Sequence, residues 1–213
     1  MVMVMLGKAK NKGKSMNLIV ERWHDTQADL NYQIYIHRSG RICYIPPKRQ
    51  INKAYVYTGS EFPLTGDLTD YQKYYYEECA MKIGRKLWEK GYYGLASIDS
   101  IITKEGVIIP IVEINGRFSL PSYVSFLPWM LGNDKVYRIR YYNLKPSITL
   151  ERIMEKIGAY TYTHGKGEGV IICSFAQGEQ GISEGRLFAV FVAEKKERLD
   201  FLEQRFIEVI HHG

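Results

Sequence analysis

The chain has 213 residues, of which 24% are charged and 46% apolar, and its formal net charge is +6. This composition is typical of a globular protein with one substantial core rather than of a disordered or fibrous chain. No apolar run reaches the ~18 residues of a membrane span. The opening Met1–Leu6 is too short for a secretory signal and precedes the first lysines. We therefore expect a cytoplasmic protein without a membrane partner.

Residues 1–16 form a basic leader with four lysines. Such a leader can bind nucleic acid, but no nucleic-acid-binding module follows it, so we do not expect that partner. Gly7–Ser15 is close to a phosphate-binding loop, which needs four residues between its glycines and a helix after them. Five residues separate Gly7 from Gly13, and an apolar, strand-like segment follows. We interpret the leader as a flexible basic segment.

The next part of the chain predicts short strands followed by one long helix. The expected strands are Asn17–Trp23, Leu30–His37, Arg41–Ile45 and Ala54–Thr58, with Pro46-Pro47 ending the third. The helix is expected over Leu68–Lys90, with Thr69 or Asp70 as its N-cap. Its buried stripe is predicted from apolar residues that repeat every four positions: Tyr71, Tyr75, Cys79, Ile83 and Leu87.

The second half of the chain predicts a hairpin, a helix and a smaller unit. The hairpin pairs Ile98–Ile102 with Val107–Ile114, and Pro121–Gly132 is expected to be helical. Asn133–Pro146 reads as a linker. The remaining expected elements are the helix Ser147–Ile157 with Ser147 as N-cap, the strands Val170–Phe175 and Arg186–Val192, and the helix Lys195–Ile210. We expect an α+β fold with an antiparallel sheet and packed helices, divided into residues 17–135 and a small α+β appendage, 136–213.

The predicted hairpin carries an unusual set of polar residues. Glu113, Asn115 and Arg117 are spaced by two, so they project to one face of their strand. Asp99, on the other strand, is expected to lie across from the Glu113 end. Two carboxylates and one carboxamide are ligands that suit Mg²⁺, which takes few protein ligands and completes its shell with phosphate oxygens and water. Solvated charges on an exposed strand are the alternative, although unpaired carboxylates within so apolar a strand would be costly.

The stretch Gly91–Arg117 resembles the metal-binding end of the ATP-grasp superfamily. The matching positions, in order and spacing, are Gly91, Gly94, Asp99, Gly106, Pro110, Glu113, Asn115 and Arg117. Members are ATP-dependent carboxylate–amine or carboxylate–thiol ligases and their relatives. The resemblance implies that Asp99, Glu113 and Asn115 hold two Mg²⁺ ions against the ATP phosphates. It implies that Arg117 binds phosphate or the reacting carboxylate.

A second segment resembles the part of the family that passes the adenine. It runs from Ile19 through Glu21 and Trp23 to Asp29. In the family, a second acidic residue, usually Glu, follows about seven residues after the position of Glu21 and holds the ribose hydroxyls. Here Asp29 lies eight residues after Glu21, so a ribose contact and an edge strand with a salt-bridged Glu21 both stay open. Lys48 or Arg49 is expected to reach a phosphate, and their spacing does not separate them.

The resemblance implies an ATP- and Mg²⁺-dependent ligase that joins a small carboxylate to an amine through an acyl phosphate. The alternative is a non-catalytic nucleotide-binding or regulatory module that keeps the fold. Only about sixteen residues precede the adenine segment, whereas the family places a phosphate-binding half there. We therefore expect the C-terminal part of a ligase, inactive alone. A missing N-terminal half or a second copy of the chain would complete its site.

Overall fold

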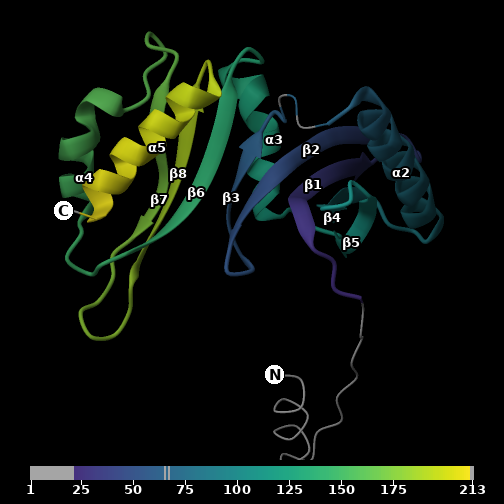
Figure 1. The fold of residues 1–213 in the computed structure, drawn as a ribbon, viewed down its shortest axis with the longest axis horizontal. Coiled ribbons are helices and arrows are strands. Elements are labelled where there is room, and N and C mark those ends of the chain that lie inside the picture. The colour runs from purple at the N-terminus through teal and green to yellow at the C-terminus, as the bar shows by residue number, and fades with distance from the viewer. Residues whose placement is uncertain (1–21, 65, 67, 212–213) are drawn as a thin grey trace, which may run out of the picture.

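The computed structural model describes residues 22–64, 66 and 68–211. These residues form one eight-stranded antiparallel sheet with helices on both faces (Figure 1). The strand order is β5-β4-β1-β2-β3-β6-β8-β7. The expected α+β class with an antiparallel sheet is confirmed. None of the helices in the described part of the chain is both long and apolar enough to cross a membrane.

The first half of the sheet is built around its most buried strand. β1 (Thr26–Ile36) pairs on one side with β2 (Ile42–Lys53), which is followed by β3 (Val56–Phe62), and on the other side with β4 (Gly94–Thr103), which is followed by β5 (Ile108–Asn115). α2 (Asp70–Glu89) covers one face of this half. Thr69 caps α2 as predicted, because its hydroxyl accepts from the backbone N–H of Gln72 while the Gln72 side chain accepts from Thr69 N–H.

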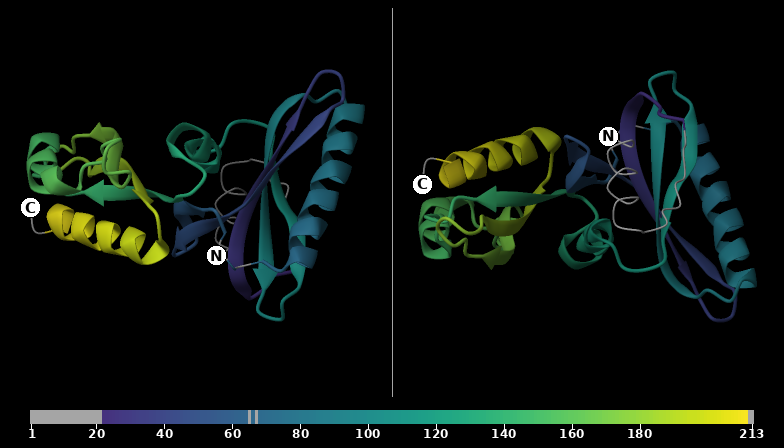
Figure 2. Two further views of the ribbon diagram at one scale, coloured as in Figure 1. Left: turned by 90° about the horizontal axis from the view of Figure 1, so that it is seen from above. Right: turned by 90° about the horizontal axis from the view of Figure 1, so that it is seen from below.

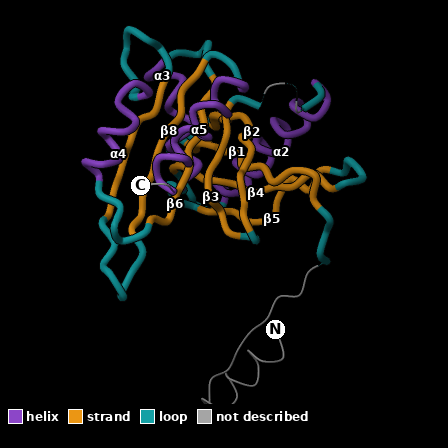
Figure 3. The backbone as a smooth tube through the Cα atoms, turned by 60° about the vertical axis from the view of Figure 1, so that its left-hand side comes forward, coloured by secondary structure: helices purple, strands orange, loops and turns teal. Residues whose placement is uncertain are grey.

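The second half continues the same sheet. α3 (Leu120–Leu131) leads into β6 (Val136–Leu144), which pairs with β3 and joins the halves (Figure 3). The later elements are α4 (Leu150–Ile157), a 3₁₀ turn at Gly158–Tyr160, β7 (Gly169–Ala176), β8 (Gly185–Ala193) and α5 (Lys196–His211). The sheet is thus continuous across the expected boundary near residue 136. The division into a main domain and an appendage stays a prediction.

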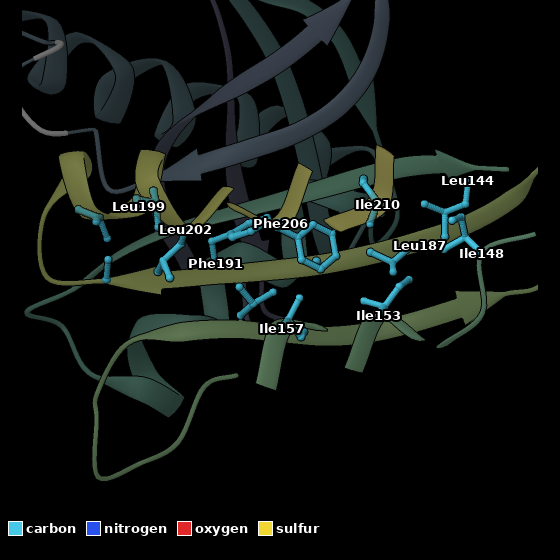
Figure 4. Packing of buried hydrophobic residues seen from close by; sticks show 14 residues of the cluster. Leu144, Ile148, Ile153, Ile157, Leu187, Phe191, Leu199, Leu202, Phe206 and Ile210 are labelled. Atoms are coloured by element: carbon cyan, nitrogen blue, oxygen red, sulfur yellow. The ribbon is translucent and has the colours of Figure 1, made fainter. Parts of the chain in front are cut away.

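Alternating side chains give the sheet apolar contacts on both faces. In β8, Phe191 and its neighbours two positions away pack against α4 and α5 (Figure 4), whereas Val190 and Val192 pack with Val124 of α3 on the opposite face. A third cluster joins α2 to β1 and β4 around Tyr76. α3 therefore lies on the face opposite α5, as Figure 2 shows.

The predicted stripe of α2 is confirmed only in part, because Ile83 and Leu87 are partly buried and pack against the core. Tyr71 is 74% exposed, and the fully buried positions are Tyr76, Ala80 and Gly84. Ala80 and Gly84 are small, and a Cβ added at Gly84 would lie 2.9 Å from the Ile42 side chain. The helix therefore contacts the sheet through small residues at close approach. Counting large apolar residues overlooks such a face.

Three predicted strand or linker boundaries are also wrong. Asn133–Pro146 is not a linker, because it contains β6, in which Arg138 is buried in ion pairs and Arg140 is partly buried in another. β2 runs through Pro46-Pro47, where the register with β1 shifts, so the prolines occupy an irregularity instead of ending the strand. Ala54–Thr58 is not one strand, since Ala54 lies in a turn with φ of 48° and β3 begins at Val56.

Two further predictions concern segment ends. Thr149, and not Ser147, caps α4, because its hydroxyl accepts from the Arg152 backbone N–H. The predicted strand Asn17–Trp23 lies outside the described residues up to position 21, and Arg22 and Trp23 are not in a strand.

Candidate functional site

Four polar residues form one row across four neighbouring strands. Glu113 of β5 is opposite Asp99 of β4, Asp99 is opposite Asn31 of β1, and Asn31 is opposite Lys48 of β2. Directly opposed residues of an antiparallel sheet project to the same face. With strands ~4.8 Å apart, the row spans roughly 15 Å. The predicted hairpin thus places Asp99 across from Glu113, and the fold adds Lys48 to the same row.

Asp99 is the most constrained member of the row. Its Oδ1 accepts from Nδ2 of Asn31 and from Nε2 of Gln50, both at 2.7 Å. Burial raises the pKa of Asp99, the two amide donors act against that rise, and the neighbouring Glu113 carboxylate raises the pKa further. Two carboxylates close together on one face favour an added cation, because the cation relieves the repulsion between their like charges.

Asn115 and Arg117 lie next to these carboxylates. Asn115 is opposite Ser97 in the register, and its Nδ2 lies 3.5 Å from Asp99 Oδ2. Arg117 donates from Nη2 to Asn115 Oδ1 at 3.1 Å and from Nη1 to the Phe118 carbonyl at 3.4 Å. Arg117 is exposed. All four residues singled out on the hairpin are therefore brought together.

The donor set suits a hard cation that takes few protein ligands. In the described part of the chain no three His, Cys, Asp or Glu side chains gather as a ready metal site. Asp99, Glu113 and Asn115 offer oxygen atoms only, which fits Mg²⁺ with phosphate and water in its other positions and fits Zn²⁺ poorly.

Lys48 carries an ammonium group that is buried without a hydrogen-bond partner among the described residues. Its side chain is fully buried and its Nζ has no hydrogen-bond partner. Burial lowers the pKa of Lys48 to about 7, although the charge of Asp99 acts to raise it. A buried ammonium without a partner is costly, so an anion that reached Nζ would be bound strongly. Arg49, the neighbouring alternative, lies on the opposite face of β2, since it is opposite Leu30.

Trp23 and Asp29, which are predicted to contact the nucleotide, line a cavity near the start of β1. It has a volume of about 810 Å³ and is lined by Trp23, Asp29, Asn52, Tyr55 and side chains of the β4–β5 hairpin. Trp23 and Tyr55 form an edge-on pair with ring centroids 5.4 Å apart. Asp29 is two residues before Asn31 on β1, so the cavity adjoins the row. Glu21 lies outside the described residues.

Sequence reasoning missed the polar residues that support the row. Asn31 and Gln33 are buried on β1, and they connect Asp99 to α3: Gln33 donates to Ser122 Oγ at 2.8 Å and accepts from Ser125 Oγ at 3.1 Å. The sequence does contain a signal for these two residues, because Asn31 and Gln33 alternate with the apolar Leu30, Tyr32 and Ile34. Polar residues at every second position of a central strand indicate a face that is occupied by something other than a core.

Comparison with known proteins finds no matching family model. One curated relative is the [butirosin acyl-carrier protein]–L-glutamate ligase of Niallia circulans. It is 27% identical over 152 residues, which cover 69% of this chain and 35% of the relative. The chain therefore spans about a third of the length of this relative.

Solved structures match over most of the chain. An ADP complex of N5-carboxyaminoimidazole ribonucleotide synthetase superposes with a TM-score of 0.65 at 13% identity, covering 97% of this chain and 55% of that one. The Aspergillus clavatus enzyme with ADP and 5-aminoimidazole ribonucleotide gives 0.62 at 12%, covering 99% and 58%. The Thermotoga maritima enzyme gives 0.58 at 14%, covering 92% and 57%.

These relatives are ATP-grasp enzymes. At such low identity the structural matches establish the fold alone, and the chain spans little more than half of each solved structure. The sequence motif, the curated relative and the fold agree. The resemblance expected from the sequence is confirmed: this chain has the fold of the C-terminal part of the ATP-grasp superfamily.

Proposed function

We propose that this chain binds Mg²⁺ and ATP as the C-terminal part of a ligase that joins a carboxylate to an amine. The observation that carries the proposal is the row Glu113–Asp99–Asn31–Lys48, which sets a paired carboxylate site and a buried, unpartnered cation on one face of the sheet. A triphosphate with Mg²⁺ complements both ends of such a row.

The residues take distinct roles in this proposal. Asp99, Glu113 and Asn115 hold Mg²⁺, which when bound neutralises charge on the phosphates. Lys48 binds a phosphate from within the sheet, and Arg117 holds the transferring phosphoryl group or the reacting carboxylate. Asp29 and Trp23 line the cavity beside the row, which accommodates the nucleoside. Glu21 is assigned to the adenine contact from the sequence alone.

The chemistry is ATP-driven amide formation. An oxygen of the substrate carboxylate attacks the γ-phosphorus, the bond to the β–γ bridging oxygen breaks, and ADP leaves. The amine then attacks the acyl phosphate, and inorganic phosphate leaves as the amide forms. Positioning and charge neutralisation provide most of the rate in phosphoryl transfer. An L-amino acid is a reasonable first substrate to test, because the curated relative is named for L-glutamate.

Calorimetric titration of the full chain with ATP, with and without Mg²⁺, tests the proposal. Glu113→Gln keeps the shape of the side chain and removes one charge, so Mg²⁺-dependent affinity should fall roughly 10-fold or more, with little change in Tm. Glu105→Gln is the matched control, since Glu105 is exposed in the turn of the same hairpin. Equal affinities for all three proteins would contradict the site.

Phosphate release with L-amino acids separates the ligase from a non-catalytic module. Because we expect the chain to be inactive alone, release is measured with and without the N-terminal half of the parent ligase. Release that needs both parts would support the ligase, whereas nucleotide binding without release from the two parts together would favour the regulatory alternative.

A further inference from the structure

The outer face of α3 is unusual for a protein surface. Residues 118–133 contain no charged side chain. Val124 packs against the sheet, whereas the solvent-facing side of the segment presents six large apolar side chains, here called the apolar stripe: Phe118, Leu120, Tyr123, Phe126, Trp129 and Met130. Trp129 is 87% exposed. A helix that is apolar all round is normally buried on all sides.

The size of the apolar stripe matches a protein interface. From Phe118 to Met130 it extends about 18 Å at the helical rise of 1.5 Å per residue. Its members are 43% to 87% exposed. Together they present on the order of 600–800 Å² per molecule, close to the ~800 Å² that each partner of a standard interface buries. Patches of this size on soluble proteins mark interaction sites.

We infer that the apolar stripe is the contact between two copies of this chain, with their α3 helices crossing antiparallel about a two-fold axis. An uncharged apolar surface is complementary to itself, which an isologous two-fold interface requires. The chain carries a net charge of +6, so two copies repel over most of their surfaces. The stripe is a place where they can meet without opposing like charges.

The charges at the ends of the stripe select the antiparallel arrangement. Arg117 stands at the start of α3, and Asp134, with a side chain 76% exposed, follows its end. Antiparallel crossing brings each Arg117 toward Asp134 of the partner subunit. Parallel crossing would bring the two arginines together, and like charges that face each other across an interface oppose association.

Antiparallel crossing also bears on the candidate site. It places Trp129 and Met130 of the partner subunit beside Phe118 and Arg117, where they shield the Arg117 end from water. This shielding rests on the proposed function, but dimer formation does not. A failure of dimerisation and a failure of nucleotide binding are therefore separate results.

Sedimentation velocity of the full chain from about 1 to about 100 µM, a range in which a standard-size interface is populated, tests the contact. We expect a dimer that Phe126→Glu/Trp129→Glu converts to a monomer. Asp134→Lys should weaken it about tenfold or more. Tyr71→Glu, at an exposed aromatic residue on α2, is the matched control and should leave it unchanged. Because the substituted side chains are exposed, each variant should keep the wild-type circular dichroism.

Cysteine cross-linking tests the orientation. Leu120→Cys mixed with Met130→Cys should give mixed disulfide dimers above the wild-type background from Cys43 and Cys173, which are exposed. Leu120→Cys alone should not. A wild-type monomer throughout the concentration range would overturn the inference, as would a dimer insensitive to Phe126→Glu/Trp129→Glu or a cross-link of Leu120→Cys to itself alone.

Discussion

The Asn31 side chain on β1 donates to Asp99 on β4, with Nδ2 2.7 Å from Asp99 Oδ1 and 2.8 Å from Ser97 Oγ. Asn31 is buried, so this amide orients Asp99 from inside the sheet. The contact joins residues 68 positions apart. The candidate metal ligand therefore depends on a strand that contributes no ligand of its own.

Replacing Asn31 by Leu should weaken the site without touching a ligand. Asp99 loses one donor to its charged form, so its pKa, already raised by burial, rises further. Mg²⁺ binding needs the carboxylate. The loss of Mg²⁺-dependent ATP affinity on acidification should therefore begin at a higher pH than in the wild type, and affinity near pH 7 should fall roughly 10- to 100-fold.

The measurement is a series of ATP titrations in Mg²⁺ across the acidic and neutral range. Asn143→Leu is the control, because Asn143 is an exposed asparagine on β6. An unshifted pH profile in Asn31→Leu would show that Asn31 does not hold Asp99.

Replacing Lys48 by Met should have opposite effects on stability and on binding. In the folded chain the pKa of Lys48 is lowered to about 7 from 10.5. Between these values the unfolded chain binds more protons at this position than the folded chain, so the free energy of unfolding rises with pH in that window. Below it, both states are protonated and the full cost of the buried charge remains.

Lys48→Met should therefore flatten the stability profile between pH ~7 and ~10 and raise Tm at neutral pH by a few degrees, while ATP affinity falls. Chemical denaturation at several pH values, paired with ATP titration, measures both. Lys53→Met, at the exposed end of the same strand, is the control. A lower Tm in Lys48→Met would mean that Lys48 has a partner in the folded chain.

Local sequence patterns predicted the hairpin well. Residues spaced by two on β5 and a glycine turn are short-range signals, and they placed Asp99 across from Glu113. Lys48 was harder to place, because its position depends on β1 lying between β4 and β2. No local pattern specifies which strands become neighbours.

The errors have a common physical origin. α2 packs through Ala80 and Gly84 as well as Tyr76, and β6 buries Arg138 among carboxylates beside its apolar residues, so in both elements some of the buried positions are not large apolar ones. Such faces are set by the shape and charge of elements distant in sequence. For the hairpin residues the family resemblance predicted which side chains lie together, because it relates residues distant in sequence, and their roles stay predictions.

Replacing Gln33 by Leu should loosen α3. Gln33 is buried and bonds to Ser122 and Ser125, so leucine removes the partner of Ser125 and leaves Ser122 bonded only to Ser119. The free energy of unfolding should fall by about 1–3 kcal/mol. Hydrogen exchange should quicken in α3 more than in α5. Gln27→Leu, an exposed change on the same strand, is the control; equal exchange rates in both variants would exclude Gln33 as an anchor.

Replacing Arg138 by Met should produce the largest loss of stability, because Arg138 holds the seam between the two halves of the sheet. It lies opposite Glu61 of β3 and bonds to Glu61, to Asp200 at 2.7 Å and to Glu203 at 2.7 Å. Glu61 keeps Lys196 at 2.9 Å and Glu203 keeps Arg140 at 2.6 Å, so we expect a cost at the lower end of the roughly 3–5 kcal/mol of a broken buried ion pair. Arg152→Met, exposed on α4, is the control.

The pH dependence distinguishes lost charge pairing from lost packing at this seam. Burial acts to raise the pKa of Glu61, but bonds from Lys196 and Arg138 lower it overall. A lowered pKa contributes stability that is present above the unfolded value and lost as pH falls through the folded one. In Arg138→Met the pKa of Glu61 should rise, so part of that acid-sensitive stability should disappear and the deficit from the wild type should shrink toward low pH. Urea denaturation from neutral to acidic pH measures this deficit. A deficit that stayed constant with pH would mean that Arg138 stabilises the seam by packing alone.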